Sequence, residues 1–260
     1  MIFKIIIIFL LVIIINLSNR HDRFTNIHNN IDKIFVINLE ESKERMNKII
    51  NQCEKANMKI ERFPAINGKY INRNNVKNLI DNDFLGKIPN GVLGCSLSHI
   101  KIWQKVAKSN YNNVLILEDD IIIPKNFWYL FNIYYKKLPS DWDIVYLGGS
   151  NIYGKLLNDK ILRPINDFKT RGNTVNLGTY AYIIKKNTAI KLLKEVVPIN
   201  KDFDFCIKQK FHKNNIYYFY KPLILHDNNQ DSIRRIIDGK KSKASLKWRF
   251  IKQSNVTLAN

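Results

Sequence analysis

Cysteine is scarce in this sequence, and the scarcity excludes two classes of small protein. The 260 residues contain three cysteines, Cys53, Cys95 and Cys206, an odd number at wide spacing. Because no Cys-x-x-Cys pair or Cys/His cluster suggests zinc, the pattern indicates neither a zinc module nor a disulfide framework. We interpret the three side chains as buried or idle thiols, with one disulfide and one leftover cysteine as the alternative.

Acidic residues are also few, because 22 Asp and Glu face 42 Lys and Arg, which gives a formal net charge of +20. Such a surplus favours polyanions, anionic membrane surfaces or phosphate-bearing small molecules as partners. However, the sequence lacks an RNP aromatic pattern, zinc-finger spacing and a recognisable helix-turn-helix. A nucleic-acid-binding protein is therefore the weaker hypothesis, and we expect no nucleic-acid partner.

One long apolar run lies at the N-terminus, where residues 2–17 are interrupted only by Lys4 and Asn16. As a helix this run is roughly 24 Å long, slightly short of a bilayer core of about 30 Å. The small-x-small cleavage pattern of a signal peptide is missing around residues 17–20. We predict an uncleaved signal anchor over residues 1–20, with the rest of the chain in the lumen of the secretory pathway. A cleaved signal peptide is the alternative.

The rest of the chain has the composition of one folded domain, with 45% hydrophobic and 12% aromatic residues overall. We predict a linker over residues 21–32, a domain over 33–227 and a basic C-terminal tail over 228–260. No internal repeat or low-complexity block interrupts the domain.

Hydrophobic patterning predicts an α/β fold. Residues 33–39 form an unbroken apolar run typical of a fully buried strand, residues 41–57 have helical spacing, and residues 59–66 form a second short strand. This βαβ unit is the signature of a parallel sheet. Further along, the pattern predicts a glycine-bearing loop running into a helix over 91–109, strands at 113–117 and 143–149, a helix over 126–138, a strand, turn and helix over 179–196, and a late strand or pair of strands over 216–227.

Three consecutive carboxylates, Glu118, Asp119 and Asp120, follow the strand at 113–117. Burying adjacent carboxylates is unfavourable unless water or a cation compensates their repulsion. At the carboxyl end of a strand, where α/β sheets bind ligands, a divalent ion such as Mn²⁺ or Mg²⁺ would supply that cation. Alternation along an extended chain would place Glu118 and Asp120 on one side and Asp119 on the other. The alternative is a solvated turn whose acids cap the next helix or pair with Lys125.

Five segments, in this order, resemble the family-25 glycosyltransferases, which include lipooligosaccharide and collagen galactosyltransferases. The segments are IFVINLEESKERM, IERFPAINGK, GVLGCSLSHIKIWQKV, NVLILEDDIIIP and GTYAYIIKKNTAIKLL. The resemblance covers about residues 33–227. It implies a GT-A type, Rossmann-like nucleotide-sugar-binding fold with a mixed, mostly parallel sheet. It also implies an inverting transfer of a hexose, galactose being the first choice, from a UDP-sugar to a hydroxyl of a glycan or protein.

The resemblance assigns the acidic triplet to the donor and its metal. Asp120 is the first choice for the ion, Glu118 contacts the donor or assists the metal, and Asp119 is a donor-binding candidate. The motif reads Glu-Asp-Asp rather than Asp-x-Asp, so the division of roles among the three stays open. His226, at the end of a late apolar run, is a candidate third metal ligand, with a structural histidine as the alternative.

Other donor-side candidates come from two of the matched segments. Asn38 ends the first strand, and Arg45 follows it, where a guanidinium could grip phosphates or lie beside Glu41 and Glu44 as a solvated cation. Ser96 and His99 lie in the GCSLSH segment. His99 would hydrogen-bond to sugar or diphosphate, or else satisfy a buried backbone group while Gly94 permits tight packing.

An inverting transfer needs a carboxylate to accept the proton of the acceptor hydroxyl. Asp202 and Asp204 are the candidates, since VPINKDFDFCI resembles the Pro-x-Asp segment of the family. Asn200 holds the position nearest the usual spacing, and either acid could instead cap a helix. Loss of this base would leave an inactive glycan-binding or scaffold protein, which is the alternative function.

Overall fold

The computed structural model describes residues 30–165, 176–227, 237 and 257–258. The predicted signal anchor, the linker up to residue 29 and nearly all of the predicted basic tail lie outside these ranges. Within them, no helix combines the length and the apolar character needed to cross a bilayer.

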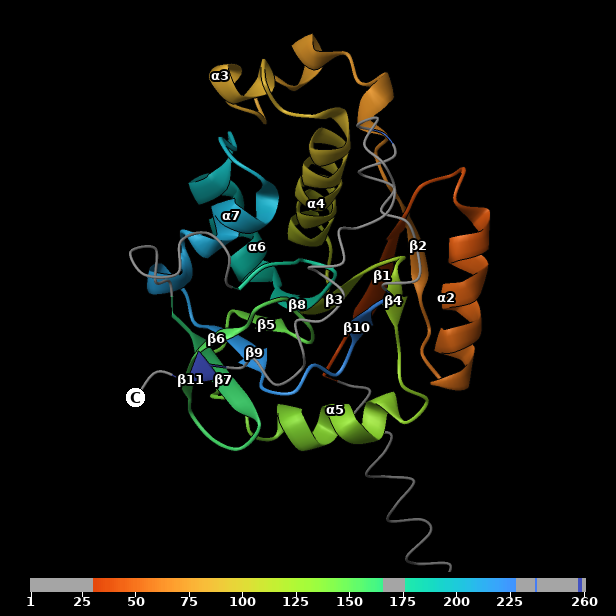
Figure 1. The fold of residues 1–260 in the computed structure, drawn as a ribbon, viewed down its shortest axis with the longest axis vertical. Coiled ribbons are helices and arrows are strands. Elements are labelled where there is room, and N and C mark those ends of the chain that lie inside the picture. Colours follow the sequence, from red (N-terminus) through yellow and green to blue (C-terminus); the bar gives the residue numbers. More distant parts are fainter. Residues whose placement is uncertain (1–29, 166–175, 228–236, 238–256, 259–260) are drawn as a thin grey trace, which may run out of the picture.

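A sheet of nine strands forms the centre of the described chain, in the order β11-β6-β7-β9-β5-β8-β3-β1-β2 (Figure 1). The described strands β7 and β8 run against the other seven, so the sheet is mixed but mostly parallel in direction. A separate antiparallel pair joins β4 to β10. The strands are β1 Lys33–Asn38, β2 Glu61–Pro64, β3 Asn113–Glu118, β4 Ile121–Ile122, β5 Ile144–Tyr146, β6 Tyr153–Leu156, β7 Ile161–Pro164, β8 Ala181–Lys185, β9 Ile216–Phe219, β10 Leu225–His226 and β11 Thr257–Leu258.

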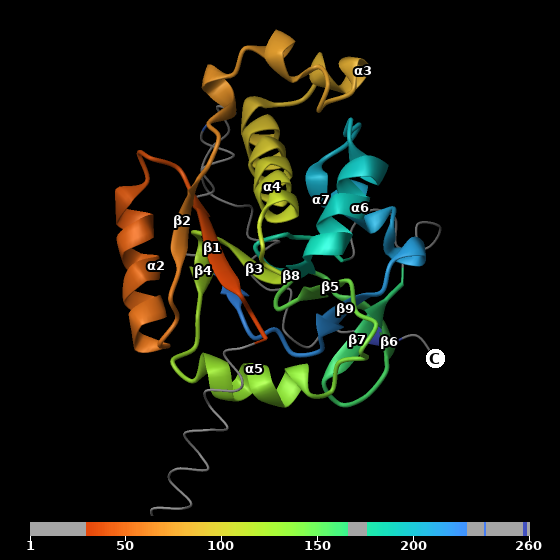
Figure 2. The same ribbon diagram turned by 180° about the vertical axis from the view of Figure 1, so that it is seen from behind.

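Helices cover both faces of this sheet. The α-helices are α2 Lys43–Lys55, α3 Asn82–Leu85, α4 Asn90–Lys108, α5 Phe127–Tyr135, α6 Lys186–Val196 and α7 Phe203–Lys208, and the 3-10 helices are η1 Gly68–Tyr70, η2 Arg73–Val76 and η3 Phe211–Lys213. Helices α4, α6 and α7 share one core with the sheet, whereas α2 and α5 belong to the other. Figures 1 and 2 show α4 and α5 on opposite sides of the strands.

The position of β3 between two cores explains why the sequence of this strand is continuously apolar. Val114 and Ile116 pack into the core under α4, whereas Leu115 and Leu117 pack into the core under α2 and α5. Both faces are therefore buried, which removes the polar alternation of a half-exposed strand. The predicted α/β class and the βαβ unit are confirmed, since β1 pairs in parallel with both β2 and β3.

The glycine-bearing segment before residue 99 is helical, so the predicted loop is wrong. Helix α4 begins at Asn90 and includes Gly91 and Gly94. A Cβ atom on Gly94 would lie 2.4 Å from the carbonyl oxygen of Ile66, and one on Gly68 would lie 1.9 Å from that of Asn90. Both glycines therefore serve the close packing of η1 on α4, which confirms the packing alternative for Gly94.

The folded unit begins slightly before the predicted domain boundary. Ile31 is buried in the core shared with α2. The carboxylate of Asp32 accepts the backbone N–H groups of Asn112 (2.6 Å) and Asn113 (2.9 Å). These two residues, assigned to the linker from sequence, hold the start of β3 beside β1.

Candidate active site

The polar residues of the site meet where β1 and β3 end. These neighbouring strands run in parallel, with Ile37 paired to Glu118, so Asn38 and the acidic triplet reach the same edge of the sheet. Ligands bind at such carboxyl edges in α/β proteins. Strand β3 stops at Glu118, and the chain bends at residues 119 and 120 before β4. The predicted side-to-side alternation of the three carboxylates is therefore wrong, because the backbone is not extended there.

Asp119 is held by groups from β1 and α2. Its two carboxylate oxygens accept hydrogen bonds from Asn38 Nδ2 (2.7 Å) and Arg45 Nη1 (3.0 Å). Burial raises the pKa of Asp119, and the hydrogen bond from Asn38 and the charge of Arg45 oppose that change. Both oxygens already have protein donors. Asp119 therefore fixes the bend, and its predicted contact with a donor stays a prediction.

One carboxylate oxygen of Asp120 contacts His226 and Arg45, and the other has no partner among the described residues. Its Oδ2 lies 3.4 Å from His226 Nε2 and 3.5 Å from Arg45 Nη1. Its Oδ1 is buried and has no hydrogen-bond partner among the described residues. Burial alone would raise the pKa of Asp120, but His226 and Arg45 outweigh burial and hold this pKa below its ordinary value. Asp120 is thus an ionised carboxylate with an unsatisfied oxygen.

Glu118 faces a different set of groups. Its Oε1 lies 3.3 Å from His99 Nε2 and 3.4 Å from Thr179 Oγ1. Arg45 is thus shared by Asp119 and Asp120, whereas Glu118 has partners of its own, and these contacts oppose the mutual repulsion of the three carboxylates. The alternative in which they cap the next helix or pair with Lys125 is wrong, because α5 has no side-chain cap and the acids bind these other groups.

Arg45 and His226 both reach Asp120, while their predicted roles in binding the donor and the metal stay predictions. The alternative for Arg45, a solvated cation beside Glu41 and Glu44, is wrong because its guanidinium contacts Asp119 and Asp120. His226 reaches Asp120 from β10, and the next residue, Asp227, donates its backbone N–H to the carbonyl oxygen of Asp120 at 2.7 Å. Buried Asp227 also accepts Lys48 Nζ at 2.5 Å, which ties the end of β10 to α2.

His99 uses both ring nitrogens on side chains. Besides Glu118, its Nδ1 lies 3.0 Å from the hydroxyl of Tyr182, which also accepts Trp103 Nε1–H at 2.9 Å. Its ring stacks on Phe203 with centroids 4.9 Å apart. The alternative in which His99 satisfies a backbone group is wrong. Neighbouring Ser96 is buried without a hydrogen-bond partner for its Oγ among the described residues, so its donor-binding role stays a prediction.

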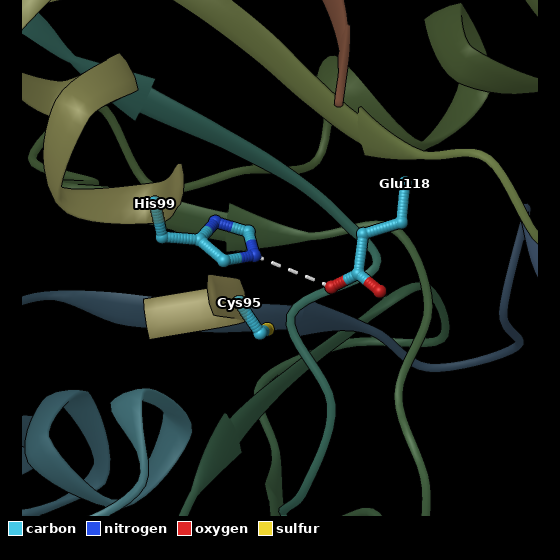
Figure 3. Close-up of side chains that lie close together, drawn as sticks. All are labelled: Cys95, His99 and Glu118. Carbon is cyan, nitrogen blue, oxygen red and sulfur yellow. Dashed lines mark hydrogen bonds and ion pairs between the residues drawn. The ribbon is translucent and has the colours of Figure 1, made fainter. Parts of the chain in front are cut away.

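Cys95 joins this group, contrary to the interpretation of the cysteines as idle. The ligand atoms of Cys95, His99 and Glu118 lie within 4.8 Å of one another (Figure 3). The signal in the sequence is the four-residue spacing of Cys95 and His99, which puts both on one face of a helix. Because this segment was interpreted as a loop, the Cys/His cluster was missed. Cys53 and Cys206 are buried as predicted.

Asp202 and Asp204 flank Phe203, whose ring covers His99. Asp204 Oδ1 accepts the backbone N–H of Phe205 (2.9 Å), and its Oδ2 accepts that of Gly178 (3.4 Å), next to Thr179. Asp202 occupies the N-cap position of α7 without a side-chain cap bond. The structure therefore places both candidate bases at the border of the site.

Comparison with known proteins gives a consistent family. The model described as glycosyltransferase family 25 (LPS biosynthesis protein) matches residues 31–207, more than half of the chain. A glycosyltransferase 25 family member of Aedes aegypti is 27% identical over 66% of this chain and 30% of its own length. Procollagen galactosyltransferase 2 of Homo sapiens is 27% identical over 45% of this chain and 20% of its own.

A bovine relative is named for the absence of activity. The probable inactive glycosyltransferase 25 family member 3 of Bos taurus is 23% identical over 72% of this chain and 33% of its own length. The chain thus spans about a third or less of the length of these curated relatives.

Solved structures resemble the chain only loosely. The glycosyltransferase GlyE of Streptococcus pneumoniae TIGR4 has a TM-score of 0.40 and 12% identity, covering 86% of this chain and 61% of its own. A glycosyltransferase involved in glycosylation of the major capsid of PBCV-1 has a TM-score of 0.43 and 9% identity, covering 80% and 96%. At these scores the likeness carries no argument about the fold.

Proposed function

We propose, because the chain belongs to glycosyltransferase family 25, that it transfers galactose from a UDP-sugar to a hydroxyl of a glycan or protein with inversion at the anomeric carbon. The proposal includes dependence on Mn²⁺ or Mg²⁺. It also includes attachment to the membrane by the apolar segment at residues 1–20, with the catalytic domain in the lumen of the secretory pathway.

The observation that carries the metal dependence is Asp120 Oδ1, which is buried and has no hydrogen-bond partner in the part of the chain that the structure describes. A buried carboxylate oxygen without a donor is unfavourable unless a cation binds it. Hard divalent ions such as Mn²⁺ and Mg²⁺ prefer carboxylate oxygens, which Asp120 supplies. Asp120 and His226, whose side chains lie 3.4 Å apart, would hold the ion. When bound, such an ion neutralises the charge that grows on a diphosphate leaving group.

The remaining residues fix the shape of this edge. Asn38 and Arg45 hold both oxygens of Asp119, so the backbone bend that presents Asp120 is set by β1 and α2. Glu118 turns Oε1 toward His99, and its other oxygen points away from His99 (Figure 3). That second oxygen is the one available to a donor hydroxyl.

Asp202 or Asp204 would act as the general base. In an inverting transfer the acceptor oxygen attacks the anomeric carbon while its proton passes to the carboxylate, and the bond between that carbon and the diphosphate oxygen breaks. Asp204 accepts the backbone N–H of Gly178. The next residue, Thr179, contacts Glu118. This link supports the choice of Asp204 as a candidate base.

An inactive glycan-binding or scaffold protein is the second candidate. One relative is named as probably inactive, and both oxygens of Asp204 already accept backbone N–H groups. Hydrolysis or transfer of a UDP-sugar with Mn²⁺ separates the two functions, because a binder would be stabilised by the ligand without consuming it.

Thermal shift with UDP-sugars, with and without Mn²⁺, tests the proposal. UDP-galactose should stabilise the protein only with the cation, and Asp120→Asn should abolish this effect. His226→Ala should raise the Mn²⁺ concentration required by about 10-fold or more. Exposed His212, replaced in the same way, is the matched control. Equal stabilisation of the wild-type protein and Asp120→Asn would show that Asp120 is not a ligand of the metal.

A further inference from the structure

Cys95, His99 and Glu118 form a second cluster of side chains that can ligate a metal ion. We propose that Cys95, His99 and Glu118 form a site for a transition-metal ion of the zinc class. This site is additional to the Mn²⁺ or Mg²⁺ site proposed at Asp120 and His226, and it does not depend on the transferase activity.

The spacing of His99 and Glu118 matches that of two ligands of a tetrahedral ion. His99 Nε2 lies 3.3 Å from Glu118 Oε1, and Thr179 Oγ1 lies 3.4 Å from each of them. These separations are long for hydrogen bonds, whose usual length is about 2.9–3.0 Å. Ligand atoms about 2.1 Å from a tetrahedral zinc ion lie about 3.4 Å from one another. The separation of His99 Nε2 and Glu118 Oε1 is therefore close to one edge of a zinc site, and Thr179 Oγ1 lies at a similar distance from both atoms.

Cys95 supplies the soft ligand. It lies one helical turn before His99 on α4, and its sulfur is within 4.8 Å of the other two ligand atoms. Cys95 and Glu118 are both partly exposed, which gives an ion a path and leaves room for a water ligand. Thiolate and imidazole together select zinc-like ions over Mg²⁺ or Mn²⁺. The two sites thus differ in the metal that they favour.

The surroundings of His99 resemble the outer shell of a metal-bound histidine. Such a histidine usually hydrogen-bonds through its second nitrogen, which fixes the ring orientation. Here Nδ1 contacts Tyr182, Tyr182 is held by Trp103, and Phe203 stacks on the ring. Nε2 is therefore directed at Glu118 by buried groups from α4, β8 and α7.

Charge also balances at this cluster. The thiolate of Cys95 and the carboxylate of Glu118 together carry two negative charges, which a divalent ion neutralises. Binding releases the thiol proton. Glu118 needs only Oε1 for the ion, so its other oxygen is still available to a sugar donor (Figure 3). An ion here would lock α4 to the end of β3 and fix the orientation of Glu118.

Cobalt(II) is the direct probe, because a cobalt–thiolate bond absorbs in the near ultraviolet. The full chain, stripped with EDTA, should develop this band up to one Co²⁺ per chain, and Zn²⁺ should remove it. Cys95→Ser should lose the band, whereas Cys206→Ser should keep it. Tyr182→Phe, which alters only the outer shell, should weaken Co²⁺ binding by about 10-fold.

Two further measurements keep the test decisive. Asp120→Asn should keep the cobalt–thiolate band even if it loses Mn²⁺ binding, which separates this site from the proposed donor metal. Zn²⁺ should slow alkylation of Cys95 in the wild-type protein, read by peptide mass spectrometry, so a misfolded serine variant does not decide the outcome. No sulfur band with Co²⁺, a band that survives Cys95→Ser, or unprotected alkylation would overturn the proposal. His99 would then be only a hydrogen-bonding support for Glu118.

Discussion

Asn38 donates a hydrogen bond of 2.7 Å to Asp119, a residue 81 positions further along the chain. This bond joins the last residue of β1 to the bend that follows β3. Arg62 in turn donates its Nε–H to Asn38 Oδ1 at 3.0 Å, so the amide links all three of the strands that end here.

Asn38→Ala should therefore destabilise the protein. The change leaves a buried carboxylate oxygen of Asp119 without its donor, which costs about 1–3 kcal/mol, and it also removes the Asn38 acceptor of the partly exposed Arg62. Urea unfolding measures the loss, and exposed Asn47→Ala on α2 is the control. An unfolding free energy equal to that of the control would show that the bend is fixed by other contacts.

Asp119 and Asp120 should affect acid stability in opposite directions. The pKa of Asp120 is lowered in the folded state, so its stabilising contribution is present above its unfolded pKa of about 3.9 and is lost as pH falls. The pKa of Asp119 is raised in the folded state, so folding strengthens proton binding by Asp119. The contribution of Asp119 to the unfolding free energy therefore rises as pH falls through the folded-state pKa of Asp119.

In Asp120→Asn, the unfolding free energy should therefore fall less steeply with decreasing pH than in the wild-type protein. In Asp119→Asn it should fall more steeply. Urea unfolding over a series of acid pH values, with a chelator present, measures both slopes. Shifts of the same sign in the two variants would contradict the assignment of partners.

Gly94→Ala should destabilise the packing of η1 on α4. Its new Cβ would lie 2.4 Å from a backbone oxygen, which cannot move away as a side chain can. We expect a loss of about 1–3 kcal/mol, as for other overpacked sites. Gly86→Ala is the matched control, because its Cβ would lie 3.8 Å from the nearest atom and its φ is −64°. Thermal unfolding of both variants should separate them, and similar melting temperatures would refute the close approach.

Asp202→Asn and Asp204→Asn, made separately, should identify the base. Loss of a general base lowers kcat by about 10²–10⁴-fold. The variant that lacks the base should show this fall with KM for the UDP-sugar unchanged, while the other should change kcat little. If both retain wild-type kcat, neither aspartate is the base.

Sequence reasoning found the parts of the fold whose cause is local. The runs at 33–39 and 113–117 are apolar on both faces, so β1 and β3 were visible, and their parallel pairing placed Asn38 and the acidic triplet together. Strand β8 was expected, but its insertion between β3 and β5, against their direction, was not. That insertion brings Thr179 and Tyr182 to the site.

The missed features depend on contacts between distant segments. Strands β4 and β10 have two residues each, too few for any periodicity, although their pairing delivers His226 to Asp120. Helix α4 was not extended back to Asn90, because its glycines are explained only by the backbone of η1. Unless the helix includes Cys95, the four-residue spacing of Cys95 and His99 does not indicate that the two side chains share a helix face.

The pairing of β10 with β4 also decides where the domain can be cut. His226 and Asp227 contribute little to the cores, yet one reaches Asp120 and the other anchors the carbonyl of that residue. A shortened protein that stops after Ile224 would keep the core residues that follow β9 and lose only the edge strand β11 from the sheet, yet it would also lose the proposed affinity for the cation. Any truncation intended to preserve catalysis should therefore retain residue 227, a limit set by chemistry rather than by packing.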